Sequence, residues 1–497
     1  MADMTDTGTD SAVAPIGTQV SALAAQAPDA PAVTCAGVTV SRADLDTTTN
    51  QVARGFASLG VGVGDYVSIV VPNSLDWVFA VLACWKLGAV PQPLSARLPD
   101  AELAALLELR RPALLVGRPD PTAMTTSTTT DLAAEFAGFP ADPLPEAVSP
   151  VWKSMASGGS TGRPKLIEAG NNSRVPPAIG YPLGAQEGDV NLISVPLSHN
   201  TGFTTFAIGL LQGHHLVVMP RFEPRQFLRL VTDHRVTILA TVPTIMQRLL
   251  PVYRAEPGSY DLSSIRRFWH LAAPCPPAVK QAWIEILGPA AVWELYGGTE
   301  LQALTFISGE QWLTHPGSVG VVVAGEMKVL DDDGNECPPG VVGEIYMRPG
   351  PAARPTYRYI GSTARTRDGW DSLGDLGYFD EEGFLYLNDR RVDMFTVGGR
   401  NVYPAEIESA LAEHPAVLSS LVVGLPDEDL GQVPHAIVQA DGLDEAGVIA
   451  FLAERIAGYK LPKSVELVER PLRDDAGKAR RSAVRDEVIA RRAAQFG

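Results

Sequence analysis

Residues 157–167 read SGGSTGRPKLI, a stretch in which glycines and hydroxylated side chains precede Arg163, Pro164 and Lys165. Glycine lets the main chain approach a ligand closely, and inward-pointing backbone N–H groups bind anions well. The stretch therefore predicts a loop for a polyphosphate. It lacks the spacing of a Walker A sequence, and the LIEA that follows is a poor start for a helix. The alternative is a surface hairpin, in which Gly, Ser and Thr are also common.

Helical and strand patterns alternate on both sides of this loop. Residues 42–59 and 75–87 have helical spacing, whereas YVSIVVP (66–72), HLVVMP (215–220) and TILATVP (237–243) are short β-rich runs. This alternation predicts an α/β fold in which strands feed helices through short loops. Between about residues 316 and 387, Asp-Gly and Pro-Gly turns separate alternating apolar positions, which predicts a small antiparallel β region.

The length of 497 residues exceeds what one hydrophobic core normally organises, so we expect more than one domain. Residues 1–17 are predicted to be a disordered leader, because this acidic and polar segment lacks the basic and apolar regions of a signal peptide. Residues 18–388 are then a large N-terminal domain, residues 389–393 a hinge, and residues 394–497 a small mobile α+β domain.

The composition excludes several classes of partner. A net charge of −17 opposes binding to nucleic acid or to an anionic membrane. The longest apolar runs are interrupted well before the roughly 20 residues of a membrane span. The four cysteines, at positions 35, 84, 275 and 337, form no C-x-x-C pair, so the sequence predicts neither a zinc site nor a disulfide framework. A reduced, cytoplasmic compartment fits this pattern.

Five further segments follow the glycine-rich loop: PLSHNTGF (196–203), HLAAPCPP (270–277), YGGTE (296–300), SLGDLGYFDEEGFLYLNDRRVD (372–393) and AGKARR (476–481). In this order they resemble the motifs of the acyl-adenylating superfamily, which includes acyl-CoA synthetases, luciferases and the adenylation domains of peptide synthetases. The resemblance covers the chain from about residue 18. It implies a large N-terminal domain with α/β sheet subdomains and a small β region, followed by a mobile C-terminal α+β domain.

The same resemblance implies an ATP-dependent acid:CoA ligase. Such enzymes join a carboxylate to the α-phosphate of ATP, expel pyrophosphate and pass the acyl group to a thiol, so ATP, Mg²⁺ and coenzyme A are expected. Lys478 matches the catalytic lysine that bridges the carboxylate and the α-phosphate. Thr299 matches a hydrogen-bond donor to that phosphate, Glu300 a ligand of Mg²⁺, and His199 the gate between the acid pocket and the thiol channel.

A second set of positions matches the family's nucleotide site. Tyr296 corresponds to the aromatic side chain that stacks on adenine. Asp375 corresponds to the carboxylate that accepts hydrogen bonds from the ribose hydroxyls, and Arg390 to a residue that supports the same ribose. The full set is Ser157, Gly158, Gly159, Ser160, Thr161, Gly162, Lys165, Ala272, Ala273, Pro274, Glu294, Leu295, Tyr296, Gly297, Gly298, Asp375 and Arg390. Three of the matched positions, Asp375, Tyr296 and the catalytic Lys478, have ordinary structural alternatives: a turn, a core position and a solvated basic face, respectively.

Two groups of residues are expected to contact the other substrates. Gly398, Gly399 and Arg400, in VGGRNVYP, match the loop that lines the thiol channel, although a plain β-turn is the alternative. The expected acyl pocket consists of mostly apolar or small side chains, namely Asn200, Phe203, Thr204, Met246, Leu301 and Thr305.

The chain departs from the family pattern at two positions. Leu301 stands where glycine usually follows the YGxTE motif, and Val392 replaces the usual aspartate or lysine of the hinge. These departures leave open an enzyme restricted to one half-reaction. A nucleotide-binding module without catalysis is a third alternative, which the presence of Lys478, Glu300 and Asp375 opposes.

Within the superfamily, HLAAPCPPAVK, YGGTE and EQWLTHPGSVG most resemble bacterial CoA ligases for bulky alicyclic acids. These act on steroid, bile-acid or terpenoid carboxylates, and they include the synthetase type of actinobacterial diterpenoid antibiotic pathways such as that of platensimycin. The expected partners are thus a small carboxylic acid, ATP or AMP, and CoA. A homodimer is compatible with the sequence.

Overall fold

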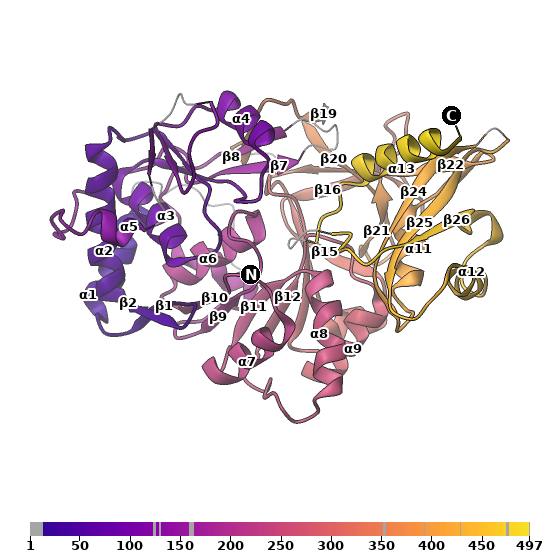
Figure 1. Cartoon of the computed structure of the whole chain (residues 1–497), viewed down its shortest axis with the longest axis horizontal. Coiled ribbons are helices and arrows are strands. Elements are labelled where there is room, and N and C mark those ends of the chain that lie inside the picture. Colours follow the sequence, from indigo (N-terminus) through magenta and orange to yellow (C-terminus); the bar gives the residue numbers. More distant parts are fainter. Residues whose placement is uncertain are drawn as a thin grey trace.

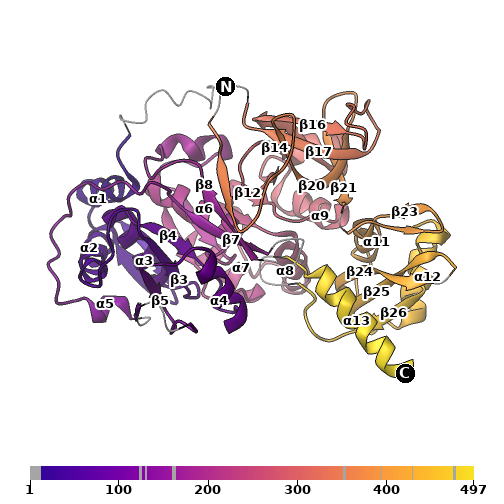
Figure 2. The same cartoon turned by 90° about the horizontal axis from the view of Figure 1, so that it is seen from above.

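The structure is a computed structural model that describes residues 13–122, 126–128, 131–158, 164–350, 354–391, 393–427, 429–473 and 477–496. A large N-terminal α/β domain occupies most of the long axis, and a small α+β domain lies at one end (Figures 1 and 2). This arrangement confirms the fold class expected from the sequence. Helix α1 (Ile16–Gln26) begins inside the predicted leader, because Ile16 is buried in the core.

A large mixed sheet forms the centre of the N-terminal domain. Its parallel part, from β13 to β1, follows the predicted α/β alternation, and the antiparallel strands β14 to β21 continue the same sheet. In spatial order its described strands are β16 (Glu326–Leu330), β17 (Gly343–Arg348), β20 (Trp370–Phe379), β21 (Leu385–Arg390), β15 (Ser318–Ala324), β14 (Leu304–Ser308), β13 (Val292–Tyr296), β12 (Arg267–His270), β11 (Ile238–Thr241), β9 (Val190–Ile193), β10 (His215–Val218), β1 (Pro31–Cys35) and β2 (Val38–Ser41), with β19 (Arg365–Arg367) beside β20.

Two smaller sheets complete this domain. The parallel one has the order β4 (Val90–Pro93), β3 (Tyr66–Ile69), β5 (Leu114–Val116) and β6 (Thr126–Thr128). The antiparallel one has the order β18 (Tyr357–Ile360), β8 (Pro164–Ala169) and β7 (Ser154–Gly158). The glycine-rich stretch joins β7 to β8, so a strand follows it, where the sequence predicted only that the residues after Lys165 are a poor start for a helix.

Helices cover these sheets and bury their apolar faces. Helix α3 has the predicted bounds, Leu75–Leu87, because Ser74 accepts a hydrogen bond from Trp77 N (3.2 Å) and Gly88 ends the helix in the left-handed region. Trp77 and Trp85 of α3 pack edge-on against Phe203. The other described helices are α2 (Arg42–Ser58), α4 (Asp100–Leu109), α5 (Leu132–Glu135), η1 (Pro177–Leu183), α6 (Asn200–Leu211), α7 (Pro224–His234), α8 (Pro243–Ala255), α9 (Pro277–Leu287) and α10 (Gly309–Thr314).

The C-terminal domain has a sheet and a core of its own. Its elements are β22 (Phe395–Val397), β23 (Arg400–Val402), α11 (Pro404–Leu411), β24 (Val417–Asp427), β25 (Gly431–Ala440), α12 (Glu445–Ala453), η2 (Gly458–Lys460), β26 (Ser464–Leu467) and α13 (Arg481–Phe496). Val402, Ile407 and Val422 are fully buried in this core. No helix within the described ranges has both the length and the apolar character to cross a membrane.

Two neighbouring glycines provide a test of backbone constraint in the antiparallel region. Both have positive φ, +87° at Gly317 and +101° at Gly320. A Cβ at Gly320 would lie 1.9 Å from the Phe306 carbonyl oxygen of β14, whereas one at Gly317 would meet nothing within 4 Å. Gly317→Ala should therefore lower the free energy of unfolding only by the cost of the left-handed conformation, about 1–2 kcal/mol.

We expect Gly320→Ala to destabilise the N-terminal domain by roughly 3 kcal/mol or more, because strand β15 must also move away from β14. Thermal unfolding followed by circular dichroism would measure the difference, with Gly317→Ala as the matched control. Equal losses of thermal stability in the two variants would contradict the close contact between β14 and β15.

Candidate functional site

A cleft of about 4060 Å³ lies where the carboxyl ends of the parallel strands meet the C-terminal domain. This volume exceeds the few hundred to about 1,000 Å³ of a site for one small ligand, so the cleft has room for several ligands. It brings together these predicted residues: Ser157, Lys165, His199, Asn200, Thr204, Ala272, Ala273, Pro274, Glu294, Leu295, Tyr296, Gly297, Gly298, Thr299, Glu300, Leu301, Asp375 and Lys478.

The glycine-rich loop borders this cleft. Ser157 and Lys165 face each other across β7 and β8, and both line the cleft. Gly158 ends β7, while the predicted residues Gly159, Ser160, Thr161 and Gly162 lie outside the described residues. The Lys165 ammonium lies 3.7 Å from the centre of the Tyr359 ring and 4.0 Å from the Glu300 carboxylate. The described ends of the loop thus direct a cation into the cleft.

Tyr296 and Asp375, from different strands, are joined by a hydrogen bond. The Tyr296 hydroxyl donates to Asp375 Oδ2 at 2.8 Å. Arg390 pairs with Asp375 along β20 and β21 through its backbone, while its side chain lies outside the described part. Ala272, which lines the same part of the cleft, has a φ of +73°. An aromatic face, a carboxylate and a wall of small residues therefore lie side by side.

Glu300 lies at the next turn of the chain and is only 5% exposed. Its Oε1 accepts a hydrogen bond from the Tyr359 hydroxyl at 2.5 Å. Burial and the Glu300 charge raise the pKa of Tyr359, so this hydroxyl remains a donor. Within the described ranges no three His, Cys, Asp or Glu side chains form a metal cluster. One carboxylate fits Mg²⁺, which is commonly held by one or two carboxylates, substrate phosphates and water.

Glu294 also borders the cleft, but its carboxylate is engaged in the protein interior. Lys280 Nζ lies 2.6 Å from Glu294 Oε2, and His270 Nε2 lies 3.8 Å from the same oxygen. Burial raises the pKa of Glu294, which Lys280 opposes. Burial and the nearby Lys280 hold the pKa of His270 well below its usual value, so this imidazole is neutral. The Glu294 carboxylate therefore supports the cleft wall from behind.

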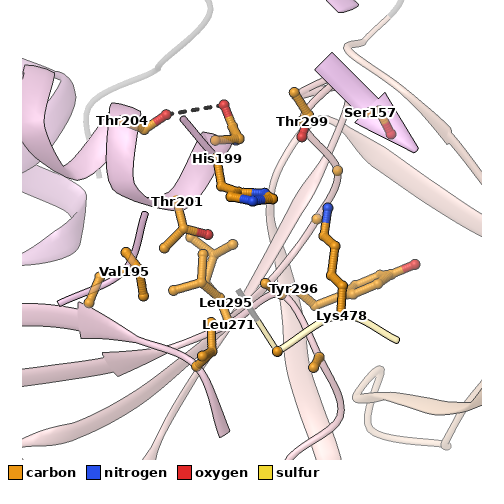
Figure 3. Close-up of a pocket in the computed structure, with 18 of the residues that line it drawn as sticks. Ser157, Val195, His199, Thr201, Thr204, Leu271, Leu295, Tyr296, Thr299 and Lys478 are labelled. Carbon is orange, nitrogen blue, oxygen red and sulfur yellow. Dashed lines mark hydrogen bonds between the residues drawn. The ribbon is translucent and has the colours of Figure 1, made fainter. Parts of the chain in front are cut away.

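His199 lies between two parts of the cleft. It is the residue before α6, and in Figure 3 its ring lies between Thr201 and Thr204 on one side and Thr299 and Lys478 on the other. The described lining of the cleft also includes these apolar side chains: Ile179, Leu183, Ile208, Ile238, Trp269, Leu271 and Phe306.

The structure does not bring three of the predicted acyl-pocket residues to the cleft. Phe203 is fully buried against Trp77 and Trp85, because it lies on the face of α6 that packs on the core. Met246 is likewise fully buried among apolar side chains. Thr305 is buried within the sheet, where its hydroxyl donates to Val319 O at 2.7 Å. Asn200, Thr204 and Leu301 do line the cleft.

Leu301 adopts a backbone conformation that favours glycine. Its φ is +52°, and its amide closes a turn on Gly298 O at 3.1 Å. A branched residue in the left-handed region is rare and costs about 1–2 kcal/mol. The expected departure at this position therefore has a structural counterpart: the turn retains the shape that suits glycine although leucine occupies it.

Lys478 reaches the cleft from the C-terminal domain. In Figure 3 its side chain extends toward the side where Thr299 and Ser157 lie. A Cβ on the preceding Gly477 would lie 3.1 Å from Thr244 Oγ1, so the Lys478 segment packs closely on the start of α8. Arg480 bonds to Glu102 of α4 at 3.0 Å. The two domains are thus oriented with Lys478 inserted.

One buried carboxylate anchors the Lys478 segment at both ends. Glu408 of α11 binds Arg473 at 2.6 Å through Oε2 and binds Arg481 through Oε1, which also accepts from Val422 N at 2.8 Å. Burial alone would raise the pKa of Glu408, but Arg481 and Arg473 hold it below its usual value. The carboxylate is therefore ionised and fixes both ends of the segment on one helix.

The predicted thiol-channel residues Gly398, Gly399 and Arg400 are not among the cleft residues in this orientation of the domains. Arg400 instead lies over the Tyr459 ring, 5.1 Å from its centre. Val392, the second departure from the family pattern, lies outside the described residues.

Sequence reasoning missed three groups that act around the cleft: Lys153, Tyr359 and Glu408. Tyr359 reaches Glu300 because β18 pairs with β8, a contact between segments far apart in the chain. Glu408 lies in YPAEIESAL and has no local signal other than an acidic residue on an apolar helix face. Lys153, four residues before Ser157, was detectable only as a lysine at the start of a buried strand.

Comparisons with known proteins agree with this architecture. The model of the AMP-binding enzyme family matches residues 20–357, and that of the AMP-binding enzyme C-terminal domain matches residues 406–478. A 2-succinylbenzoate–CoA ligase of Bacillus licheniformis is 31% identical over 450 residues, covering 87% of this chain and 91% of the relative. A fatty acid–[acyl-carrier-protein] ligase of Streptomyces coeruleorubidus is 31% identical, covering 92% and 93%.

A solved structure shows the same likeness in three dimensions. The o-succinylbenzoate CoA synthetase of Bacillus subtilis, in complex with its acyl-adenylate intermediate, superposes with a TM-score of 0.81 at 28% identity. The match covers 95% of this chain and 98% of that one.

The anchoring role of Glu408 predicts a local change in order. Glu408→Gln should raise amide hydrogen exchange about tenfold or more in peptides that cover residues 477–484, because the neutral amide loses its charge-assisted bonds to two arginines. Exchange measured by mass spectrometry would show this. Glu406→Gln is the matched control, since Glu406 lies on the same helix but pairs with Lys460 at 2.5 Å. Equal exchange in both variants would contradict the anchor.

Proposed function

We propose, since the chain belongs to the AMP-binding enzyme family and is an AMP-forming acid:CoA ligase, that its acid is a bulky alicyclic carboxylate of the terpenoid or steroid type. One observation carries the proposal: a single cleft contains Lys478, Glu300 and the Tyr296–Asp375 pair together with many apolar side chains, and His199 lies between the side of Lys478 and the side of Thr204. The nucleotide binds on the first side and the acyl group on the second.

In the first half-reaction a carboxylate oxygen of the acid attacks the α-phosphorus of ATP, and pyrophosphate leaves with the electrons of the broken P–O bond. Two anions must approach one another, so positioned cations and donors offset their repulsion. Lys478 supplies a cation to the carboxylate and the α-phosphate, and Thr299 supplies a hydroxyl donor. Lys165 supplies a second cation for the phosphates. Mg²⁺, when held by Glu300, supplies further positive charge.

The Tyr296–Asp375 pair orients the nucleoside. Tyr296 offers its ring to adenine while its hydroxyl holds Asp375. The second Asp375 oxygen is then directed toward the ribose hydroxyls, which donate to it. Ala272 and its neighbours provide a flat wall opposite the ring. Binding energy gained at these remote groups helps to hold the α-phosphate in line with the acid.

In the second half-reaction the thiolate of CoA attacks the acyl carbonyl carbon, and AMP leaves. The domains must reorient, because Lys478 occupies the cleft while Gly398, Gly399 and Arg400 lie outside it. These three residues line the route of the pantetheine arm after the movement. Because one relative is named as a carrier-protein ligase, a carrier-bound thiol is the alternative acceptor.

The apolar cavity supports a bulky acid. Its walls come from α6, η1 and the strands β11, β12 and β14, with Ile208, Ile238, Trp269 and Phe306 among them. Broad apolar walls suit a fused-ring guest, which buries much surface with few rotors to immobilise. Terpenoid and steroid acids have this form, which is also the form expected in a diterpenoid antibiotic pathway.

A panel of acids tests the proposal. Steroid and terpenoid acids, a linear fatty acid, ferulate and 2-succinylbenzoate are each incubated with protein, ATP and Mg²⁺, with and without CoA. Mass spectrometry then identifies acyl-AMP and acyl-CoA. Rates at least tenfold higher for the alicyclic acids support the proposal. A higher rate with a linear or planar acid would contradict the proposed substrate class.

Lys478→Ala should separate the two half-reactions. We expect acyl-AMP formation to fall about 10²- to 10³-fold, because one preorganised charge is lost. Thioester formation from a supplied acyl-AMP should change little, since the lysine serves only the domain orientation seen here. Quenched-flow assays with acid and ATP, and separately with synthetic acyl-AMP and CoA, measure the two steps. A similar loss in both would rule out this role.

Leu301→Gly tests whether the unusual leucine limits the first step. Glycine suits a φ of +52°, so the substitution should relieve about 1 kcal/mol of backbone strain. If Leu301 crowds the phosphates, pyrophosphate release at saturating acid should rise.

If Leu301 instead forms the pocket wall, the same substitution should weaken acid binding by roughly 1.5–3 kcal/mol without raising that rate. We expect the second outcome, because one side chain turns away from a phosphate more easily than a whole loop is rebuilt. A faster adenylation step in Leu301→Gly would instead favour the alternative that Leu301 slows adenylation in the wild-type enzyme.

A further inference from the structure

Lys153 is a buried cation behind the acyl side of the cleft. It is 2% exposed, and its ammonium lies over the Trp152 ring, 4.6 Å from the centre. Burial lowers its pKa to about 7, against the opposing influence of Glu300. Its polar contacts within the described part of the chain are Asn200 Oδ1 and, at 3.3 Å, Thr204 Oγ1. A buried ammonium group costs free energy unless hydrogen-bond acceptors surround it.

The chemistry of Lys153 fixes the orientation of the Asn200 amide. An ammonium can only donate, so Asn200 must turn its oxygen toward Lys153. The Thr204 hydroxyl also donates to Oδ1, at 3.3 Å. Among the described residues the hydrogen bonds of the Asn200 side chain thus all fall on its oxygen. The amide nitrogen, with two N–H groups, points elsewhere, and Asn200 is half-buried in the cleft wall.

The position of Asn200 in the cleft determines which part of the substrate its amide contacts. Thr204, which shares the contacts of Asn200, lies across His199 from Thr299 and Lys478 in Figure 3. Asn200 begins α6, the helix that also carries Thr201 and Thr204, so we place its amide on the acyl side of His199. The same face of α6 places Thr201, Thr205 and Ile208 along the cleft. A polar strip thus follows one wall of a cavity whose other walls are apolar.

We propose that the acid carries an oxygen acceptor on its acyl skeleton, a carbonyl, hydroxyl or ether, which accepts a hydrogen bond from Asn200 Nδ2. Lys153 is a positioning residue that holds this donor toward the cleft. The inference rests on the proposed function and narrows its substrate class to oxygenated alicyclic acids. An acid without such an oxygen leaves the N–H groups of the Asn200 amide unpaired when it binds. Because an unpaired buried donor costs free energy, the site selects against such an acid.

The test compares matched acids. Keto-substituted steroid and terpenoid acids and their deoxygenated parents serve as probes, and kcat/KM for pyrophosphate release is measured for each. The wild-type protein should prefer at least one keto acid over its parent by about tenfold or more. Asn200→Asp should abolish this preference, because a carboxylate still pairs with Lys153 but cannot donate to a ketone. Asn335→Asp, the same change on an exposed turn, should keep the preference.

Lys153→Met distinguishes positioning from a structural role. Without the ammonium the Asn200 amide can rotate, so kcat/KM for the keto acid should fall by a larger factor than kcat/KM for its parent. Equal losses on both acids would show that Lys153 only supports the fold, and would overturn its assigned role. Should this variant not fold, Asn200→Asp alone decides the proposal.

The outcomes separate this inference from the function on which it rests. Pyrophosphate release with every keto acid equal to that with its parent would overturn the oxygen acceptor and leave the ligase intact. Release with no alicyclic acid would overturn the proposed substrate class, and the inference with it.

Discussion

The arrangement of the site depends on one buried carboxylate, that of Glu408. It binds Arg473 and Arg481, which flank the segment that carries Lys478, and it accepts a backbone hydrogen bond from β24 as well. A long flexible lysine gains precision only if its backbone is fixed, because the side chain itself has little rotational restraint. The C-terminal domain can therefore move as a unit and still deliver the ammonium to the same place. Removing one member of such a buried ionic group leaves the others unpaired, which is strongly unfavourable.

Cations in and beside the cleft oppose the electrostatic repulsion that the net charge of the whole protein exerts on anionic substrates. A net charge of −17 repels nucleotides and carboxylates at long range, so their capture depends on local cations. Lys478 lies across His199 from Thr201 and Thr204, Lys165 lines the same cleft, and Lys153 contacts Asn200 of the cleft wall. Each is placed by a different part of the chain: Lys165 by β8, Lys478 by the segment after Arg473, and Lys153 by the residue position just before β7. Because Lys153 is desolvated, its influence on the acyl side comes chiefly through the amide that it orients.

The sequence predicted the motifs that converge on the cleft but not all of their contacts. Helix α3 followed from its helical spacing, and the lack of a helix start directly after the glycine-rich loop followed from the residues after Lys165. Phe203 was assigned to the pocket although it packs on the core, because NTGFTTFAIGLL is apolar on nearly every side and gives no clear face. The Lys153–Asn200 contact joins two elements 47 residues apart, which no local pattern reveals. The distance of Gly398 and Gly399 from the cleft reflects the domain orientation, which local motifs do not specify.

The central claim is that an oxygen of the acid attacks the α-phosphorus of ATP in this cleft. Oxygen transfer from an acid labelled with ¹⁸O in its carboxylate tests it directly. Complete turnover with ATP and CoA should leave one ¹⁸O atom in AMP, because the bridging oxygen of the acyl-adenylate stays with phosphorus when the thiol attacks carbon. Mass spectrometry of AMP, pyrophosphate and phosphate locates the label. Unlabelled AMP, with ¹⁸O in phosphate or pyrophosphate, would contradict the account.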